Sequence, residues 1–74
     1  MKFCPGYYIK EYMESVEMSD IEMCSYLDVD MEFLTKLLNG TESVDLKLAK
    51  KLSSLLNTSV ELWLNLQRSY DSNE

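Results

Sequence analysis

The stretch SDIEMCSYLDVDMEFLTKLLNG, from Ser19 to Gly40, decides the fold of this 74-residue chain. Apolar residues recur in it at helical spacing, with one interruption near its middle. The spacing predicts two short helices, at about residues 19–27 and 31–39, joined by a turn of two residues. The rest of the chain is expected to hold this pair in place.

Local signals fix where each of the two helices begins and ends. Ser19 and Glu22 have the spacing of a capping box, and Asp30 is a strong N-cap residue. Gly40 supplies the left-handed residue that ends a helix. A connection this short forces the two helices to cross sharply, in a helix-turn-helix arrangement. The apolar positions are Ile21, Cys24 and Leu27 in the first helix and Phe33, Leu34, Leu37 and Leu38 in the second.

Three more helices are predicted around this pair. Apolar residues at helical spacing and capping signals mark each of them. We predict helices from about Gly6 to Glu17, from a cap at Ser43 or Asp45 to Leu56, and from about Ser59 onward, the last with a second capping box of Thr58 and Glu61. The expected fold class is therefore all-α: one compact five-helix domain over residues 1–74.

Composition narrows the class of protein. A chain of this size buries only about 60% of its unfolded surface, so its core is marginal and dimerisation would help it. No apolar run approaches the roughly 20 residues that span a bilayer, and the start of the chain lacks the features of a signal peptide.

The two cysteines are expected to be reduced thiols, as in a cytoplasmic protein. With no histidine in the sequence, we expect no metal site, no cofactor and no enzyme activity.

Charge is distributed unevenly along the chain. Residues 1–45 hold ten acidic residues and three lysines, a net charge of −7, whereas residues 46–74 have a net charge of +1. The stretch from 19 to 40 alone holds five acids and one lysine, a net charge of −4. The predicted helix-turn-helix therefore lies in the acidic part of the chain.

With five helices predicted, the sequence resembles a known family over nearly its whole length, from Pro5 to Asp71. The resemblance is to the HigA-type antitoxins, in the XRE group of lambda-repressor-like helix-turn-helix proteins. The matching segments are PGxxIKEYMES, MSxxEMxxYL, LxKLLNGxxSV, LAxKLSxLLNTS and ELWLNLQxxYD. The resemblance implies a dimeric, DNA-binding repressor with a lambda-repressor-like fold. Many members also neutralise a ribonuclease toxin.

The sequence departs from the family pattern at the positions that face DNA. The family commonly has Gln at the start of the first helix of the pair, where this chain has Asp20, and Gly in the turn, where it has Asp28. The second helix of the pair, at about residues 31–39, would be the recognition helix. In the family this helix commonly begins with Ser followed by Arg, Gln or Thr, and here it begins with Asp30, Met31 and Glu32. Because DNA affinity comes largely from lysines and arginines, these acids are expected to weaken it.

Two functional hypotheses follow. The first is an antitoxin-type transcriptional regulator that binds double-stranded operator DNA as a homodimer. Its expected contacts are Asp30, Met31, Glu32 and Thr35 to base edges, Lys36, Ser43 and Lys47 to phosphates, and Leu62, Leu66 and Tyr70 between subunits. The lysines at 47, 50 and 51 form either a solvated face or a small phosphate-contacting patch.

The second hypothesis is a helix-turn-helix scaffold used to bind protein. Its acidic surface would imitate DNA or dock on a basic partner such as a toxin, as in acidic inhibitors from phages and mobile elements. Exposed methionines, expected at Met18, Met23 and Met31, would suit an adaptable contact surface. A basic rim over the recognition helix, from Lys47, Lys50, Lys51 and Arg68 of a second subunit, would favour DNA, and a continuous acidic face would favour a protein partner.

Overall fold

The fold is taken from a computed structural model, which describes residues 3–72. Within these residues the chain forms five helices and no strand, as expected for the all-α class. The helices are α1 (Pro5–Ser15), α2 (Asp20–Leu27), α3 (Met31–Asn39), α4 (Leu46–Leu56) and α5 (Val60–Asp71). The predicted helices over about 19–27 and 31–39 correspond to α2 and α3.

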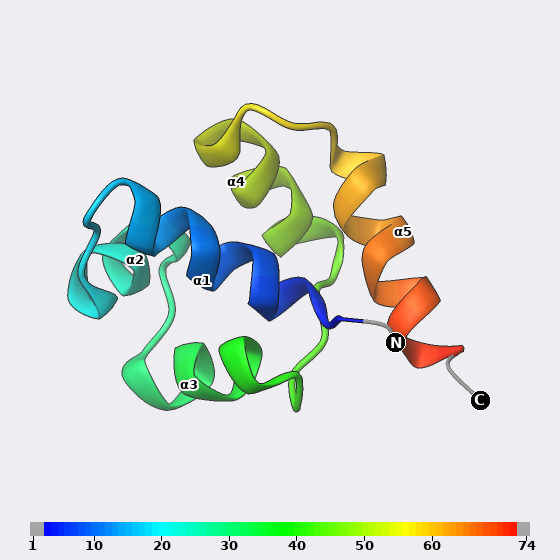
Figure 1. The fold of residues 1–74 in the computed structure, drawn as a ribbon, viewed down its shortest axis with the longest axis horizontal. Coiled ribbons are helices and arrows are strands. Elements are labelled where there is room, and N and C mark those ends of the chain that lie inside the picture. Colours follow the sequence, from blue (N-terminus) through cyan, green and yellow to red (C-terminus); the bar gives the residue numbers. More distant parts are fainter. Residues whose placement is uncertain (1–2, 73–74) are drawn as a thin grey trace.

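The helices pack around one another without layers (Figure 1). α1 crosses the middle of the molecule and packs against α3 and α5, while α4 packs against α5 and α2. At Gly6, α1 approaches α3 so closely that an added Cβ would lie 2.1 Å from the carbonyl oxygen of Leu37. This crossing therefore requires a residue without a side chain.

Most of the predicted helix ends are confirmed. Ser19 accepts from the Glu22 N–H and Glu22 accepts from the Ser19 N–H, so the capping box is complete. Asp30 caps α3, and Asp45 rather than Ser43 caps α4. Gly40 ends α3 with φ of 86°.

The core lies between all five helices. Trp63 and Ile9 are among its largest fully buried side chains, and Ala49 is buried where α4 meets its neighbours. The remaining buried hydrophobic side chains are Met13, Met23, Leu27, Leu34, Leu37, Val44, Leu48 and Leu52. Gln67 is also buried, and its side chain accepts from the Val44 N–H and donates to Asp71.

In the first helix of the pair, the burial predicted for Ile21 and the exposure predicted for Met23 are both wrong. Ile21 is 72% exposed, and Met23, which was expected to be exposed, is fully buried. At about 100° per residue, Met23 lies about 40° from Leu27 around the helix, whereas Ile21 lies about 120° away. The buried stripe of α2 is therefore formed by Met23, Leu27 and the half-buried Cys24.

Two predicted helix boundaries also differ from the structure. α1 ends at Ser15 instead of Glu17, because Glu17 adopts a left-handed conformation with φ of 57°. Ser59, and not Thr58, caps α5, so the predicted box of Thr58 and Glu61 does not form. Thr58 instead accepts a hydrogen bond of 2.7 Å from the indole N–H of Trp63.

None of the helices within residues 3–72 has the length and apolar character needed to cross a membrane.

Candidate nucleic-acid interface

The turn between α2 and α3 sets the angle at which α3 is presented. Asp28 adopts the left-handed conformation (φ 60°) that ends α2, and the Val29 N–H donates to the carbonyl of Cys24. Val29 is half-buried against the core. From outside the pair, the Lys51 ammonium donates to the carbonyl of Leu27 at 3.0 Å, which ties α4 to the end of α2.

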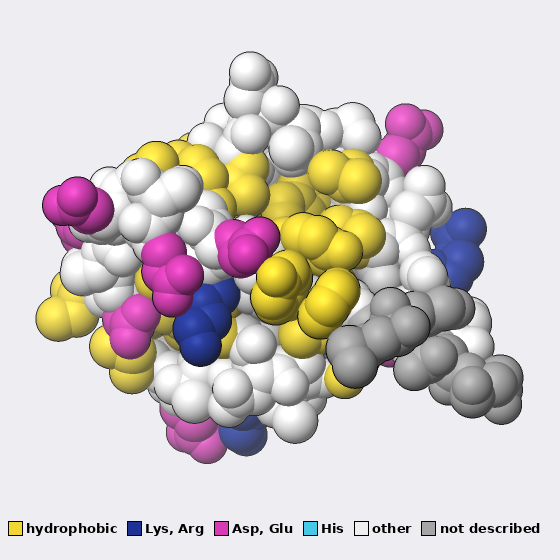
Figure 2. Space-filling model, in the orientation of Figure 1, with side chains coloured by type: hydrophobic (Ala, Val, Ile, Leu, Met, Phe, Trp, Pro, Cys, Tyr) yellow, Lys and Arg dark blue, Asp and Glu magenta, His cyan; other side chains and the backbone are white. Residues whose placement is uncertain are grey.

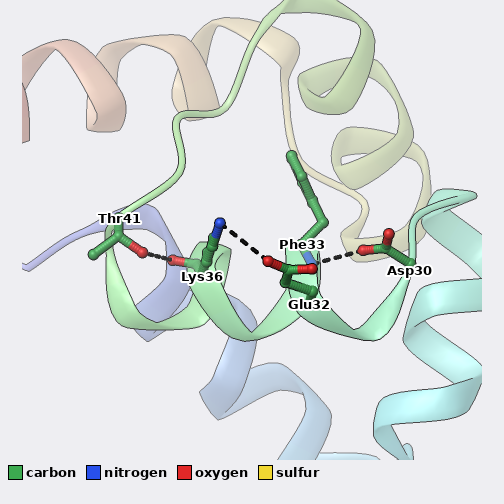
Figure 3. Close-up of polar contacts among 5 residues, drawn as sticks. All are labelled: Asp30, Glu32, Phe33, Lys36 and Thr41. Atoms are coloured by element: carbon green, nitrogen blue, oxygen red, sulfur yellow. Dashed lines mark hydrogen bonds and ion pairs between the residues drawn. The ribbon is translucent and has the colours of Figure 1, made fainter.

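Asp30 is held by the helix that it begins. Its carboxylate accepts from the Phe33 N–H at 2.8 Å (Figure 3). This contact satisfies one of the free amide groups at the start of a helix. Asp30 is exposed, but its predicted role at a base edge competes with this capping role.

The exposed side of α3 carries the other predicted base contacts. Met31 is 43% exposed and Glu32 projects from the first turn with 78% of its side chain exposed. The ammonium of Lys36 lies 3.4 Å from the Glu32 carboxylate, one turn further along (Figure 3). Within residues 3–72 no other ion pair is formed. Lys36, predicted to contact phosphate, is therefore engaged by an acid of its own helix.

Thr35 lies about 60° around the helix from Glu32 and about 100° from Lys36. It lines a hollow of about 400 Å³ together with Lys10 and Asp20. The rest of its lining is mixed, with the apolar side chains of Met13, Met18 and Leu38 beside Glu14, Glu17 and Asn39. Thr35 and the Glu32–Lys36 pair therefore line different hollows, although all three residues are exposed on α3.

Ser43 and Lys47 lie on the other side of the Glu32–Lys36 pair. Ser43 is exposed in the linker between α3 and α4, next to Glu42, which lines a small hollow with Glu32 and Lys36. Lys47 is exposed in the first turn of α4. It lines a further hollow together with Asp28, from the turn between α2 and α3. Both predicted phosphate contacts are therefore free to meet solvent or a ligand beside α3.

The electrostatic character of this surface is acidic. Asp20, Glu22, Asp28, Asp30 and Glu32 are all exposed, and the single lysine of the stretch is paired. The acids also affect a neighbouring thiol. Burial, with smaller contributions from Asp20 and Asp30, raises the pKa of Cys24 above its ordinary value. Cys4 and Cys24 form no disulfide.

An apolar groove lies away from this surface, beside α5. It has a volume of about 410 Å³, and Leu62, Leu66 and Tyr8 line it. Figure 2 shows hydrophobic side chains gathered over the first half of α1 and towards α5, with charged side chains grouped on the side of α2. Leu62 is 41% exposed and Leu66 is half-buried. Tyr70 does not line the groove, because its hydroxyl lies beside Gly40.

Two residues with a clear place in this arrangement were missed by sequence reasoning. Lys51 was grouped with the solvated lysines, and its bond to Leu27 joins residues 24 positions apart, a separation that no local pattern reveals. Tyr8 contributes to the apolar groove, although its helix spacing gave no sign of a link to α5.

Comparison with known proteins gives a match to a family. The family described as Helix-turn-helix matches residues 9–63. Virulence-associated protein A' of Dichelobacter nodosus is 35% identical over 68 residues, which are 90% of this chain and 59% of that protein. The chain spans a little more than half the length of the curated relatives it matches first.

Solved structures show the same fold. An addiction module antidote protein of the HigA family from Coxiella burnetii is 32% identical, with a TM-score of 0.86 over 96% of this chain and 79% of that one. The antitoxin HigA of Pseudomonas aeruginosa, solved with the higBA promoter, has a TM-score of 0.86 at 21% identity, over 96% and 78% of the two chains. The second likeness shows the fold alone. The resemblance to HigA-type proteins that the sequence indicated is confirmed.

Proposed function

Because the chain belongs to the helix-turn-helix family, we propose that it is a transcription regulator that binds operator DNA through α2 and α3. The observation that carries this proposal is the geometry of the pair. A turn of three residues, which begins with the left-handed Asp28, presents the exposed side of α3, with Met31, Glu32 and Thr35, outward. In this family of motifs the second helix enters the major groove.

Phosphate contacts are proposed at the residues that flank α3. Ser43 can donate its hydroxyl, and Lys47 can bring a positive charge that no acid within residues 3–72 pairs with. Such contacts fix the position of a protein on DNA without reading sequence. They are also the contacts that must offset the repulsion between the acids of α2 and α3 and the DNA backbone.

A dimer is proposed through the apolar groove beside α5. Leu62 and Leu66 line the groove, and the exposed ring of Tyr8 extends it towards α1. Covering this groove would remove from water apolar surface that a chain of 74 residues cannot bury on its own. Dimeric regulators of this kind read two half-sites about one helical turn of DNA apart.

Neutralisation of a toxin is a finer proposal. The structural relative from Coxiella burnetii, at 32% identity, is an addiction module antidote protein of the HigA family. We propose that this chain has a cognate toxin with a basic surface, because the chain itself is acidic, with a net charge of −6. Stable association with the product of a neighbouring gene would support this proposal.

A second candidate function is favoured by the apolar side chains among the acids. Ile21, Tyr26 and Met31 are 72%, 44% and 43% exposed on α2 and α3. Together with the five acids of this stretch, these apolar side chains would suit a basic protein partner. The surface of α2 and α3 would then imitate DNA for that partner. This function is favoured if the folded protein binds no duplex at low salt and co-purifies with a basic protein, and if Ile21→Ala abolishes that association.

Paired variants of basic residues test the proposed DNA interface. Lys47→Gln is expected to weaken binding to all duplexes by a similar factor and to reduce the salt slope by about 0.9 for each phosphate contact removed. Arg68→Gln is the matched control, because Arg68 is exposed on α5, away from α3 and from the three lysines of α4. Electrophoretic mobility shifts at several salt concentrations provide the measurement. Equal affinities for the two variants would place the phosphate contacts elsewhere.

A further inference from the structure

We propose that Glu32 and Lys36 act as one unit that reads a G·C base pair in the major groove. Glu32 accepts from the cytosine amino group, and Lys36 donates to guanine. This inference rests on the proposed binding of DNA by α3. In this inference Lys36 contacts a base instead of a phosphate. The Glu32 carboxylate gains a hydrogen-bond donor on the DNA.

The position and exposure of the two side chains carry the inference. They lie one turn apart on the exposed side of α3, with 78% of Glu32 and 50% of Lys36 exposed. Glu32 is in the first turn of α3, and the N-terminal residues of a recognition helix are those that contact base edges. Lys36 is in the last turn and reaches Glu32 through the ion pair. Asp30, the other acid at this end, is engaged by the Phe33 N–H and does not compete for the same base (Figure 3).

The ion pair matches the edge of a G·C pair. Its acceptor and donor atoms lie 3.4 Å apart. Cytosine presents an amino donor next to the guanine O6, and guanine adds N7 as a second acceptor. Lysine has three donors and a carboxylate has several acceptor sites, so both groups can stay paired while they bind the base edges. An A·T pair also presents a donor, the adenine amino group, but this donor lies between the acceptors adenine N7 and thymine O4, so the lysine finds no two adjacent acceptors there.

Charge explains why the two residues are needed together. An isolated carboxylate on α3 would be repelled by the phosphates on both sides of the groove. Lys36 neutralises Glu32 within the helix, so the pair enters the groove without net charge. The pair therefore supplies sequence preference, and the affinity must come from residues outside it.

Base preference is measured by selection of duplexes from a random library, followed by titration of the selected duplex. We expect the wild-type protein to require a G·C pair at one position of each half-site. Its replacement by A·T should cost about tenfold in affinity. Glu32→Gln should move the preference at that position towards A·T, because glutamine pairs with adenine. Glu61→Gln, the same change at an exposed site on α5, should leave the preference unchanged.

The variants distinguish this inference from the proposed function. If the wild-type protein selects a sequence and Glu32→Gln leaves every base preference unchanged, the base-reading unit is refuted while DNA binding stands. If the wild-type protein binds no duplex, both are refuted. Lys36→Gln should lose the G·C preference. A Lys36→Gln variant that loses affinity equally for all sequences would return Lys36 to a phosphate contact and overturn the paired role.

Discussion

Trp63 is the residue on which the core depends most. Its side chain is 1% exposed, and its indole N–H donates to Thr58 at 2.7 Å, just before α5 begins. A buried indole needs such a partner, since an unpaired polar group in a core is costly. The same residue therefore fills the core and fixes the connection from α4 to α5.

Truncation of this side chain should be severe. We expect Trp63→Ala to lower the free energy of unfolding by about 3–5 kcal/mol, as other large core truncations do. Trp63→Phe, which keeps a ring and loses the hydrogen bond, should lose about 1–2 kcal/mol. Thermal unfolding followed by circular dichroism measures both. A Trp63→Ala variant that melts like the wild type would show that the residue is outside the core.

Cys24 should react slowly with alkylating reagents. Burial, Asp20 and Asp30 raise its pKa above the ordinary value of 9.0, so at pH 8 less of it is thiolate than in a free cysteine. In a Cys4→Ser variant, iodoacetamide should modify the folded protein more slowly than a cysteine peptide. The same shift means that Cys24 favours the folded state below the ordinary thiol pKa and loses that contribution as the pH rises through its folded pKa. Reaction as fast as the peptide would contradict the shift.

At the scale of the elements, α4 supports the helix-turn-helix through one lysine. The α2 helix has no basic residue in its last turn, and the Lys51 ammonium instead reaches the carbonyl of Leu27 from α4. A cation at the carboxyl end of a helix is favourable. The orientation of the pair is therefore stabilised by a contact from outside it.

Removal of this contact should be detectable. We expect Lys51→Met to lower the free energy of unfolding by roughly 1 kcal/mol. Lys50→Met, an exposed neighbour on the same helix, should have little effect. Urea unfolding of both variants provides the comparison. Equal stabilities would mean that the Lys51 bond contributes nothing in solution.

The structure shows which parts of the elements the sequence predicts well. Helix starts with a Ser or Asp cap were found because a cap is a local signal. The buried face of α2 was assigned wrongly at Ile21, which fits a helical spacing with Cys24, whereas the face that packs against α3 and α4 is centred on Met23 and Leu27. Thr58 looked like a cap, but its hydroxyl serves Trp63. The helix-turn-helix motif predicted which residues of α3 are exposed. It did not predict the Glu32–Lys36 ion pair, because that pair depends on the conformations of two side chains.

At the scale of the whole molecule, charge and apolar surface occupy different sides. The acids of α2 and α3 surround the exposed side of α3, and the apolar groove of Leu62 and Leu66 lies beside α5. This separation would let one surface contact DNA or a basic protein while the other pairs two copies. The order of the charges along the sequence already indicated the acidic half, but the groove required the fold.

The proposed dimer gives a prediction about size. We expect the protein to be a dimer at micromolar concentration and Leu62→Glu to make it a folded monomer, because a carboxylate in the groove could not be buried without a partner. Leu46→Glu is the control, because Leu46 is 53% exposed on α4 and lies outside the groove. Size-exclusion chromatography with light scattering measures the mass. A wild-type monomer would refute the interface.

The most direct test of the central claim, that an acidic helix-turn-helix binds operator DNA, is a fluorescence anisotropy titration. The protein is titrated against a duplex from the region upstream of its own gene and against an unrelated duplex, at about 50 and 200 mM salt. We expect tighter binding to the upstream duplex, weakened at the higher salt by a slope of about −0.9 for each phosphate contact. Absence of binding to either duplex at the lower salt, by a protein that circular dichroism shows to be folded, would contradict the claim.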